Sequence, residues 1–424
     1  MLTLSNLERA NFRHLYTEIF WYGIFFGTSL TFWGVYAARL GATPFQIGLL
    51  SSGPGLVNLI ISLPAVLLLE TGYPERGTFI SSIFNRVLFT LLIFLPFLRS
   101  SELQIWLIVV IAFISALPGT ILTMSANLML AEVVPVDWRA TVIGRRSALL
   151  SVSITGSILF SGLIFDKVVF PQSYQIIFGI GMIGAAVSSY HLSRVISERR
   201  FHAEGNFQFL KKTIRSWIKN SIEYLQVGWQ KIFKTKIEKL LRMDLLKGSF
   251  GTFIISYLIF YTICAFPIPI YILFLVQTIK VSDFVISIGN SIFYTAMILF
   301  SLLLARLSWL LGHHKVLVIS GFLYILYPTV GGFAQDPLLF YIASFFGGAA
   351  WGLANGALIN RLFERAPEND RPASMAFHNL ALNLGTLVGV LIGSILPNYF
   401  GLRDALILSG GLRSVGGLIL LFWG

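Results

Sequence analysis

The segment EVVPVDWR at residues 132–139 returns as ERAPENDR at residues 364–371, 232 positions further along the chain. Both copies keep the pattern E-x-x-P-x-x-x-R, and each joins two long apolar runs. A helix-loop-helix unit that occurs twice, half a chain apart, indicates that the protein arose by duplication. In the run after each copy, small residues recur every four positions: Ser153, Ser157 and Ser161, then Gly385, Gly389 and Gly393.

These ladders of small residues predict faces on which helix backbones approach closely. A third ladder consists of Gly348, Gly352 and Gly356. A role in ligand binding is the alternative.

The composition places the protein in a lipid bilayer. Hydrophobic residues make up 56% of the chain and charged residues 12%, with a mean hydropathy of +0.78, whereas soluble domains are about a quarter charged. A run of about 20 apolar residues crosses the hydrocarbon core as one helix. The sequence therefore predicts an all-α integral membrane protein whose twelve transmembrane helices form two pseudo-symmetric six-helix bundles. The twelve runs lie near residues 18–38, 46–69, 78–98, 104–130, 147–165, 174–193, 249–277, 284–305, 315–333, 338–362, 373–397 and 404–423.

Three segments divide the predicted chain: an N-terminal bundle at 1–193, a basic linker at 194–247 and a C-terminal bundle at 248–424. The linker holds thirteen basic and five acidic residues, so it supplies +8 of the net charge of +12. Its apolar residues, Trp217 and Trp229 among them, recur at helical spacing between lysines, which is typical of an amphipathic helix lying on anionic lipid. A solvated linker is the alternative. Since the charge is concentrated there, we expect no nucleic-acid partner.

Lysines and arginines also predict the orientation, because positively charged loops stay on the cytoplasmic side. With the N-terminus inside, 24 of the 31 lysines and arginines fall in inner segments and five in outer ones. The first apolar run is too long for a cleavable signal and is followed at once by a second. We therefore expect a multi-pass protein of the cell (plasma or inner) membrane with both termini in the cytoplasm.

Six spans, a long basic loop and six more spans resemble the major facilitator superfamily over the whole chain. The repeated E-x-x-P-x-x-x-R is similar to the segment that joins the fourth helix to the fifth, and the tenth to the eleventh, in that superfamily. The loop LETGYPERG at 69–77 resembles its cytoplasmic G-x-x-x-D-R-x-G-R-R signature, with Glu70 in the place of the aspartate. The resemblance implies a secondary active transporter that moves a small organic solute by alternating access. Its substrate site would lie between the two bundles, near the membrane midplane.

Four ionisable residues inside predicted spans are candidates for a functional role, because a charge costs about 2.5 to 3.5 kcal/mol at the bilayer centre. Glu18 and His378 are candidates for proton coupling; the alternatives are a carboxylate paired with Arg13 near the headgroups and a histidine that only hydrogen-bonds within its bundle. Arg86 and Arg413 would hold an anionic substrate or couple to a carboxylate if they are functional. Snorkelling or ion pairing would make them structural.

Polar and aromatic residues at helical spacing are candidates for the wall of the substrate site. Asparagine amides facing lipid would lack hydrogen-bond partners, which favours an inward position, while aromatic stripes are also typical of packing. The set indicates a neutral or amphipathic solute held by stacking and amide hydrogen bonds. The candidate substrate-binding residues are Tyr22, Ser29, Trp33, Asn127, Tyr261, Tyr294, Trp351, Asn355, Asn379 and Asn383.

Charged residues in the predicted cytoplasmic loops form a candidate gate that pairs across the two halves when the inner mouth is closed. The alternative is a set of solvated charges, each worth under about 1 kcal/mol. The gate candidates are Glu70, Arg76, Glu132, Arg139, Glu364 and Arg371.

The sequence lacks a P-loop, a dinucleotide-binding glycine fingerprint, H-E-x-x-H and C-x-x-C. We therefore expect no enzyme, no cofactor and no metal site, and a monomer whose partners are a small-molecule substrate and the bilayer. Two alternatives remain. One is a transport-inactive sensor or scaffold, and the other is a membrane-embedded enzyme acting on lipid-linked substrates, which would need clustered carboxylates or histidines at one membrane face.

Overall fold

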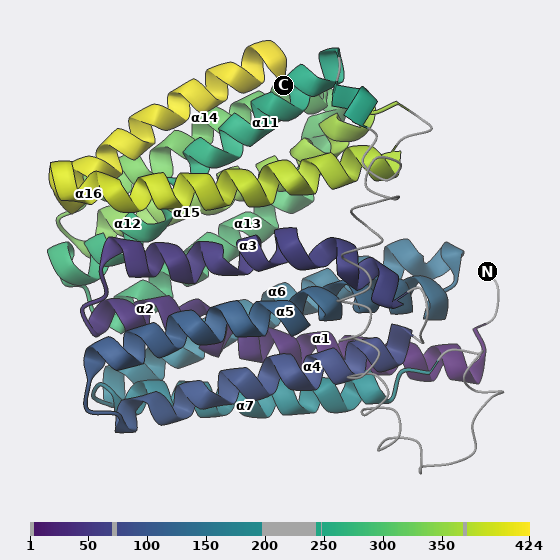
Figure 1. The fold of residues 1–424 in the computed structure, drawn as a ribbon, viewed down its shortest axis with the longest axis horizontal. Coiled ribbons are helices and arrows are strands. Elements are labelled where there is room, and N and C mark those ends of the chain that lie inside the picture. Colours follow the sequence, from purple (N-terminus) through teal and green to yellow (C-terminus); the bar gives the residue numbers. More distant parts are fainter. Residues whose placement is uncertain (1–3, 70–73, 197–242, 247, 368–370) are drawn as a thin grey trace.

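Two stacked groups of long helices, one from each half of the chain, make up the molecule (Figure 1). The computed structural model describes residues 4–69, 74–196, 243–246, 248–367 and 371–424, and these residues contain no β-strand. Helices suit a chain in hydrocarbon, because they satisfy all their backbone hydrogen bonds within one segment. The N-terminal group consists of α1 (Asn6–Phe25), η1 (Phe26–Leu30), α2 (Thr31–Arg39), α3 (Pro44–Leu69), α4 (Pro74–Thr90), η2 (Leu91–Phe97), α5 (Ser101–Val133), α6 (Val136–Lys167) and α7 (Gln172–Ser193).

The C-terminal group lies above it in Figure 1, coloured green to yellow. We call the end at which α7 finishes the linker end, on the right of Figure 1, and the opposite end the distal end. The group consists of η4 (Met243–Leu246), α11 (Ser249–Ala265), α12 (Ile268–Leu273), η5 (Phe274–Ile279), α13 (Asp283–Leu311), α14 (His313–Gly332), α15 (Pro337–Arg365) and α16 (Arg371–Trp423).

Equivalent helices of the two groups make equivalent contacts. In the N-terminal group α1 packs on α6, and in the C-terminal group α11 packs on α16. Between the groups, α3 packs on α16 while α6 packs on α13, so that each half offers the same two positions to the other. The predicted pair of pseudo-symmetric bundles is confirmed by this arrangement.

The first rod of each half has irregular backbone in its second part. A π-helical turn, η1, separates α1 from α2, and a second, η5, follows α12. Pro267 and Pro269 also divide the second rod, since proline removes a backbone donor and clashes with the preceding turn. Interruptions of this kind are frequent at functional sites.

Ten helices among the described residues are long and apolar enough to cross a membrane. That count treats α16 as one helix, although Gly401, with φ of 75°, bends it sharply. It also omits the interrupted rod α1–η1–α2. Dividing α16 at Gly401 and adding that rod gives the twelve crossings that the sequence predicts; length and composition alone show ten.

The ladders of small residues are helix contacts, as predicted. Cβ atoms built on Gly385, Gly389 and Gly393 would meet backbone or Cβ atoms of α11, and those on Gly348 and Gly352 would meet the backbone of α13. In the first half the glycines lie on the first rod, and the small residues of the ladder on α6 are serines. Gly23 of α1 and Gly27 of η1 lie against Ser153 and Ser157 of α6, where a built Cβ would stand 2.7 and 2.9 Å from the serine Cβ atoms.

One apolar cluster joins the two halves near the distal end. It includes Phe32 and Tyr36 from α2 together with Tyr271, Leu273 and Phe340 of the C-terminal half. Two other clusters each stay within one half: the first lies in the C-terminal group, and the second surrounds Phe12 and Met129 near the linker end of the N-terminal group. The apolar contact that holds the halves together is therefore concentrated toward the distal end.

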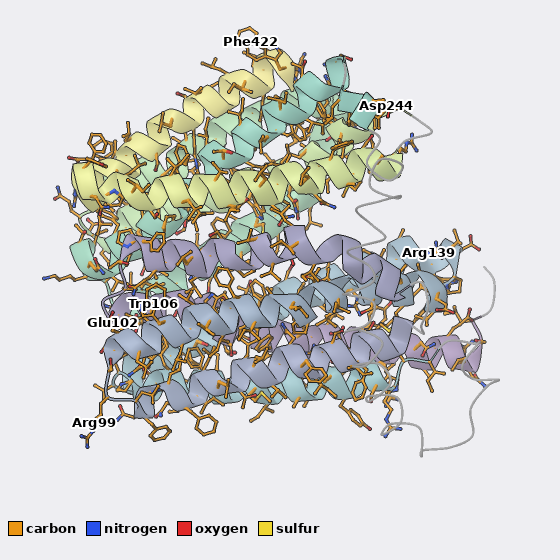
Figure 2. The ribbon with its side chains drawn as sticks, in the orientation of Figure 1. Arg99, Glu102, Trp106, Arg139, Asp244 and Phe422 are labelled. Atoms are coloured by element: carbon orange, nitrogen blue, oxygen red, sulfur yellow. The ribbon has the colours of Figure 1, made fainter. Side chains whose placement is uncertain are left out.

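The outer surface suits a lipid environment. Large apolar side chains such as Leu302 and Trp309 are 73% and 83% exposed. Charged side chains stand at the two ends of the helices, with Arg99 at the distal end and Arg139 at the linker end (Figure 2). The protein is thus a multi-pass membrane protein.

The predicted amphipathic stripe of the linker, with Trp217 and Trp229, lies outside the described residues, of which this region contains 194–196 and 243–246.

Candidate functional site

A cavity of about 350 Å³ lies between the two halves. This volume is at the lower end of the range of about 300–1,000 Å³ for small-molecule sites. The interrupted rods of both halves contribute to its wall, so the irregular backbone of η1 and η5 lies beside it. The lining residues are Phe26, Leu30, Thr31 and Val35 from the N-terminal half, and Pro267, Ile268, Tyr271, Ile272, Leu275, Ile286, Asn290, Phe293, Tyr294, Tyr327, Phe340 and Arg413 from the C-terminal half.

Polar contacts join the two halves on the distal side of this cavity. Arg39, at the end of α2, forms an ion pair of 2.8 Å with Asp283, at the start of α13, and also donates to the carbonyl of Val281. Gln277 of η5 donates to the carbonyl of Ala42 over 3.2 Å. We call Arg39 and Asp283 the distal latch.

Aromatic rings shape the cavity wall. Tyr271 and Tyr327 are stacked, with ring centroids 4.3 Å apart and planes inclined by 18°. Phe26 of the first half meets Tyr294 of the second edge to face, at 6.3 Å. Rings held in this way offer flat apolar surfaces with polar edges, which favour a solute that has an apolar or aromatic part.

Arg413 brings a charge to the same wall. It lies in the second part of α16, and only 3% of the residue is exposed. Its two terminal nitrogens donate to the carbonyls of Tyr324 and Cys264 over 2.7 and 2.6 Å. The guanidinium carbon lies 4.5 Å from the centre of the Tyr324 ring.

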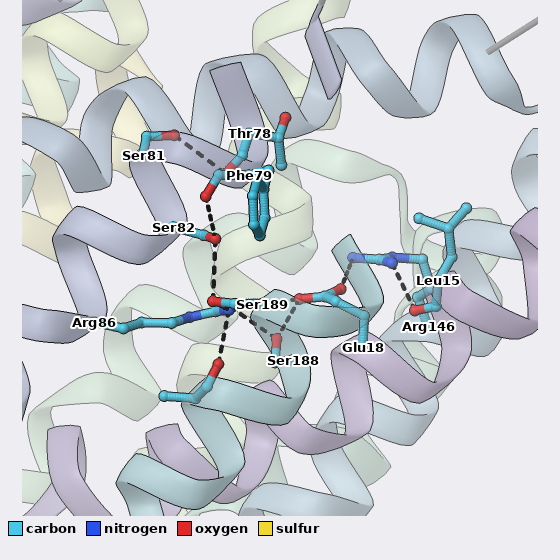
Figure 3. A network of polar contacts seen from close by, with 11 residues as sticks. Leu15, Glu18, Thr78, Phe79, Ser81, Ser82, Arg86, Arg146, Ser188 and Ser189 are labelled. Atoms are coloured by element: carbon cyan, nitrogen blue, oxygen red, sulfur yellow. Dashed lines mark hydrogen bonds and ion pairs between the residues drawn. The ribbon is translucent and has the colours of Figure 1, made fainter. Parts of the chain in front are cut away.

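A second polar site is built around Glu18 within the N-terminal half (Figure 3). Its carboxylate accepts from Arg146 of α6 over 3.0 Å and from Ser188 of α7 over 2.9 Å, and it lies 3.8 Å from Arg86 of α4. Arg86 donates in turn to Ser188, to Ser189 and to the carbonyl of Ala185. We call Glu18, Arg86, Arg146, Ser188 and Ser189 the Glu18 network.

The network explains how three charges are tolerated inside the bundle. Glu18 is 4% and Arg86 3% exposed, and charges buried to this extent must be paired and hydrogen-bonded. In the structure Arg86 is an ion-pair partner of Glu18, which is the structural role that the sequence analysis gave as its alternative. Glu18 pairs with Arg146 and Arg86, and not with Arg13, which the sequence offered as the alternative partner.

Of the ten predicted substrate-binding residues, Tyr294 lines the cavity. Tyr22 lies beside Arg86 of the Glu18 network. Ser29 is buried against α7, and the Trp33 ring packs on Phe89 with centroids 5.5 Å apart. The side chain of Asn127 is exposed.

The remaining candidates all belong to the C-terminal half. The Tyr261 ring packs at 5.8 Å on the His378 ring, and the Trp351 ring lies 6.2 Å from that of Tyr324. Asn383 donates to the carbonyl of Asn379 over 2.8 Å, while Asn355 is exposed. These residues stay predictions as substrate contacts.

The proton-coupling candidate His378 is buried in α16. Its ring lies 5.8 Å from that of Tyr257 as well as from that of Tyr261, and its Nδ1 atom has no hydrogen-bond partner. The histidine thus faces α11, away from the residues that line the cavity.

Two of the described gate candidates, Arg139 and Glu364, contact their own halves in this conformation. Arg139 donates to the carbonyls of Val134 and Ala131, so it caps the last turn of α5, where a cation is favourable. Glu364 lies 2.8 Å from Arg361, three residues earlier in α15. Glu132 and Arg371 have exposed side chains. Glu70 and the side chain of Arg76 lie outside the described residues.

Sequence reasoning missed the distal latch, Arg146 and most of the cavity wall. Tyr327 directly precedes Pro328 inside α14, and Tyr271 follows Pro269. Aromatic residues beside prolines within a span were therefore the available signal for the stacked pair. Arg39 and Asp283 lie at span ends, where a charge needs no explanation, and their pairing has no signal in the local sequence.

The sequence model of the Major Facilitator Superfamily matches residues 19–271 and 253–424. The chain belongs to this superfamily. Membership makes it a membrane transporter and not an enzyme, as the sequence predicts on both points.

Solved structures share the fold over nearly the whole chain. The nucleoside transporter NupG is 15% identical, with a TM-score of 0.68 and 99% of each chain covered. A bacterial homologue of the human lysosomal transporter Spinster, inward-facing and unoccupied, is 13% identical, with a TM-score of 0.70 and coverage of 99% of this chain and 98% of that one. The xylose transporter XylE from E. coli, partially occluded and inward-open, is 12% identical, with a TM-score of 0.65 and coverage of 98% and 97%. No curated protein matches the sequence.

Proposed function

We propose that the protein is a secondary active transporter that moves a small organic solute by alternating access. The observation that carries the proposal is the cavity between the halves, which is closed on its distal side by the distal latch and by the apolar cluster around Phe32 and Tyr271. A site between pseudo-symmetric repeats, sealed at one end, is what rocking of the repeats about a fixed site requires.

The charge distribution supports placing the linker end in the cytoplasm. The linker and the other inner segments hold 24 of the 31 lysines and arginines, and such loops remain inside. With this orientation the distal latch lies on the outer side of the cavity, which supports an inward-facing conformation. The proposal includes a monomer in the cell membrane, with both termini in the cytoplasm and the linker 194–247 lying on anionic lipid.

Proton coupling is part of the proposal, with Glu18 as the first candidate group. Its carboxylate lies between two guanidiniums and ties α1 to α4, α6 and α7. A proton on this carboxylate would remove the charge that holds both arginines, so protonation would alter the packing of the first rod. His378, buried between two tyrosines of α11, is the corresponding group in the second half.

Uptake into proteoliposomes tests the function. Purified protein is reconstituted, and labelled solutes are screened with and without an inward proton gradient. Saturable uptake of at least one solute above protein-free vesicles is expected. The gradient should raise its initial rate in the wild type but not in Glu18→Gln, compared at equal amounts of folded protein. Solute binding without any flux or counterflow would favour the sensor over the transporter.

A further inference from the structure

Arg413 differs from the other deeply buried arginine of this chain in how its charge is balanced. Arg86 and Arg413 are each 3% exposed. Arg86 has the Glu18 carboxylate 3.8 Å away and shares it with Arg146. Within the part of the chain that the structure describes, no aspartate or glutamate lies within 4 Å of the Arg413 side chain, whose two hydrogen bonds both go to backbone carbonyls.

The guanidinium of Arg413 retains unused donors. It carries five N–H groups in a planar fork, and the two carbonyls of Tyr324 and Cys264 account for one on each terminal nitrogen. Its Nε is buried without any hydrogen-bond partner. A buried donor without a partner, on a full charge, is among the least favourable groups in a protein interior.

The unbalanced charge of Arg413 lies at the wall of the cavity. It is the one charged residue among the described residues that line the cavity between the halves. The ionisable groups that interact with it are the Cys264 thiol and the phenols of Tyr271, Tyr324 and Tyr327. Thiols and phenols are ordinarily uncharged at pH 7, so the protein leaves one positive charge uncompensated at the cavity wall.

We propose that Arg413 is the anchor for a carboxylate and that the solute is a small amphipathic monoanion. The inference rests on the proposed function and names the substrate class of the same cavity. A carboxylate matches the guanidinium fork with two parallel hydrogen bonds, and one guanidinium balances one negative charge. The stacked pair Tyr271–Tyr327 and the rings of Phe293 and Phe340 then contact an apolar or aromatic body.

Acids paired with their amides test the charge requirement. The probes are benzoate, phenylacetate and hexanoate, each compared with the carboxamide of the same skeleton, for binding to the full chain in detergent by calorimetry. At least one acid is expected to bind about ten-fold or more tightly than its amide, because hydrogen bonds to charged groups contribute this much. Arg413→Gln should remove the preference. The matched control is Arg403→Gln, an arginine of the same helix that lies outside the cavity lining and should keep it.

A second variant leaves the bonds of Arg413 to Tyr324 and Cys264 intact. Asn290 lines the same cavity, and Asn290→Asp adds a carboxylate of nearly the same shape there. This internal anion should lower the preference for acid over amide at least as strongly as Arg413→Gln does. Equal binding of acids and amides by the wild type, or a preference that survives in both variants, overturns the proposal.

Flux measurements separate this proposal from the transport function on which it rests. If Arg413→Gln carries a neutral solute into proteoliposomes at the same rate as the wild type, the protein is a transporter but the proposed anion site is wrong. If the acid binds through Arg413 but shows neither uptake nor counterflow, the anion site is supported and the transport function is wrong.

Discussion

At the scale of single residues, the Glu18 carboxylate holds together side chains from four helices. Arg86 and Arg146 come from α4 and α6, and Ser188 comes from α7. Because Glu18, Arg86 and Ser188 are buried, their stability depends mainly on the balance of charge within the network.

Glu18→Gln should therefore destabilise the fold strongly. The change leaves the buried guanidinium of Arg86 and the partly buried one of Arg146 without an anion, and breaking a buried pair costs about 3–5 kcal/mol. The unfolding temperature in detergent should fall accordingly. Adding Arg86→Gln to Glu18→Gln should recover part of the loss, since one uncompensated charge is then removed; strictly additive losses would contradict the network.

The His14–His191 pair predicts a pH dependence of stability. Burial and the neighbouring His191 lower the pKa of His14, which lies before the first predicted span, below its usual value of 6.5, and the two Nδ1 atoms are 2.9 Å apart. A folded-state pKa below the unfolded one means that the fold prefers the neutral ring. This stabilisation is fully present above about pH 6.5 and is lost as the pH falls through the folded-state pKa.

Thermal unfolding measured between pH 7.5 and 5.5 tests the direction of this pH dependence. The wild type should lose more stability on acidification than His14→Asn, which cannot take up a proton at this position. A variant that loses as much as the wild type would show that His14 does not contribute to the pH dependence.

At the scale of elements, the contact of α16 with α11 depends on glycine. A Cβ on Gly389 would overlap with the carbonyl oxygen of Thr262, whereas a Cβ on Gly411, in the same long helix, would meet nothing within 4 Å. Alanine has a higher helix propensity than glycine by up to about 1 kcal/mol, and overpacking costs about 1–3 kcal/mol. Gly389→Ala should therefore destabilise the protein, while Gly411→Ala should leave it unchanged or slightly more stable; equal effects would refute the packing role.

The distal latch should control access to the cavity from the distal side. Asp283→Asn removes the charge that pairs with Arg39, and half-buried pairs of this kind are worth about 1 kcal/mol, so the distal-open population should rise up to about five-fold. Labelling of a cysteine at position 290 by an impermeant maleimide, in a Cys264→Ser background, measures that access. Asp404→Asn, an exposed acid at the same end, is the control and should leave the labelling rate unchanged.

Element-scale features were also the most predictable from the sequence. Small residues every four positions foretold the α6 and α16 contacts, because this spacing places them on one helix face. The latch joins residues 244 positions apart in the chain, and Glu18 meets Arg146 across 128 positions. Rings that pack and rings that line a cavity share the same helical spacing, so Tyr271 and Tyr327 could not be told apart from Trp33 before the fold was known.

At the scale of the whole molecule, the two halves touch mainly toward the distal end and enclose the cavity between them. The α3–α16 and α6–α13 seams are related by the pseudo-symmetry, so a rotation of one half on the other preserves both. Alternating access requires a second state in which the distal latch is broken and the linker ends approach each other.

Two distances, measured by spin-label spectroscopy in lipid nanodiscs, test the existence of this second state most directly. One pair of labels stands at the distal end, at Arg99 and Gln335, and one at the linker end, at Asp137 and Arg365, where the native side chains are exposed. Asp283→Asn or a bound solute should lengthen the distal distance in the same fraction of molecules in which the linker-end distance shortens. Distances that stay fixed at both ends, or that lengthen together, would contradict transport by rocking of the two halves.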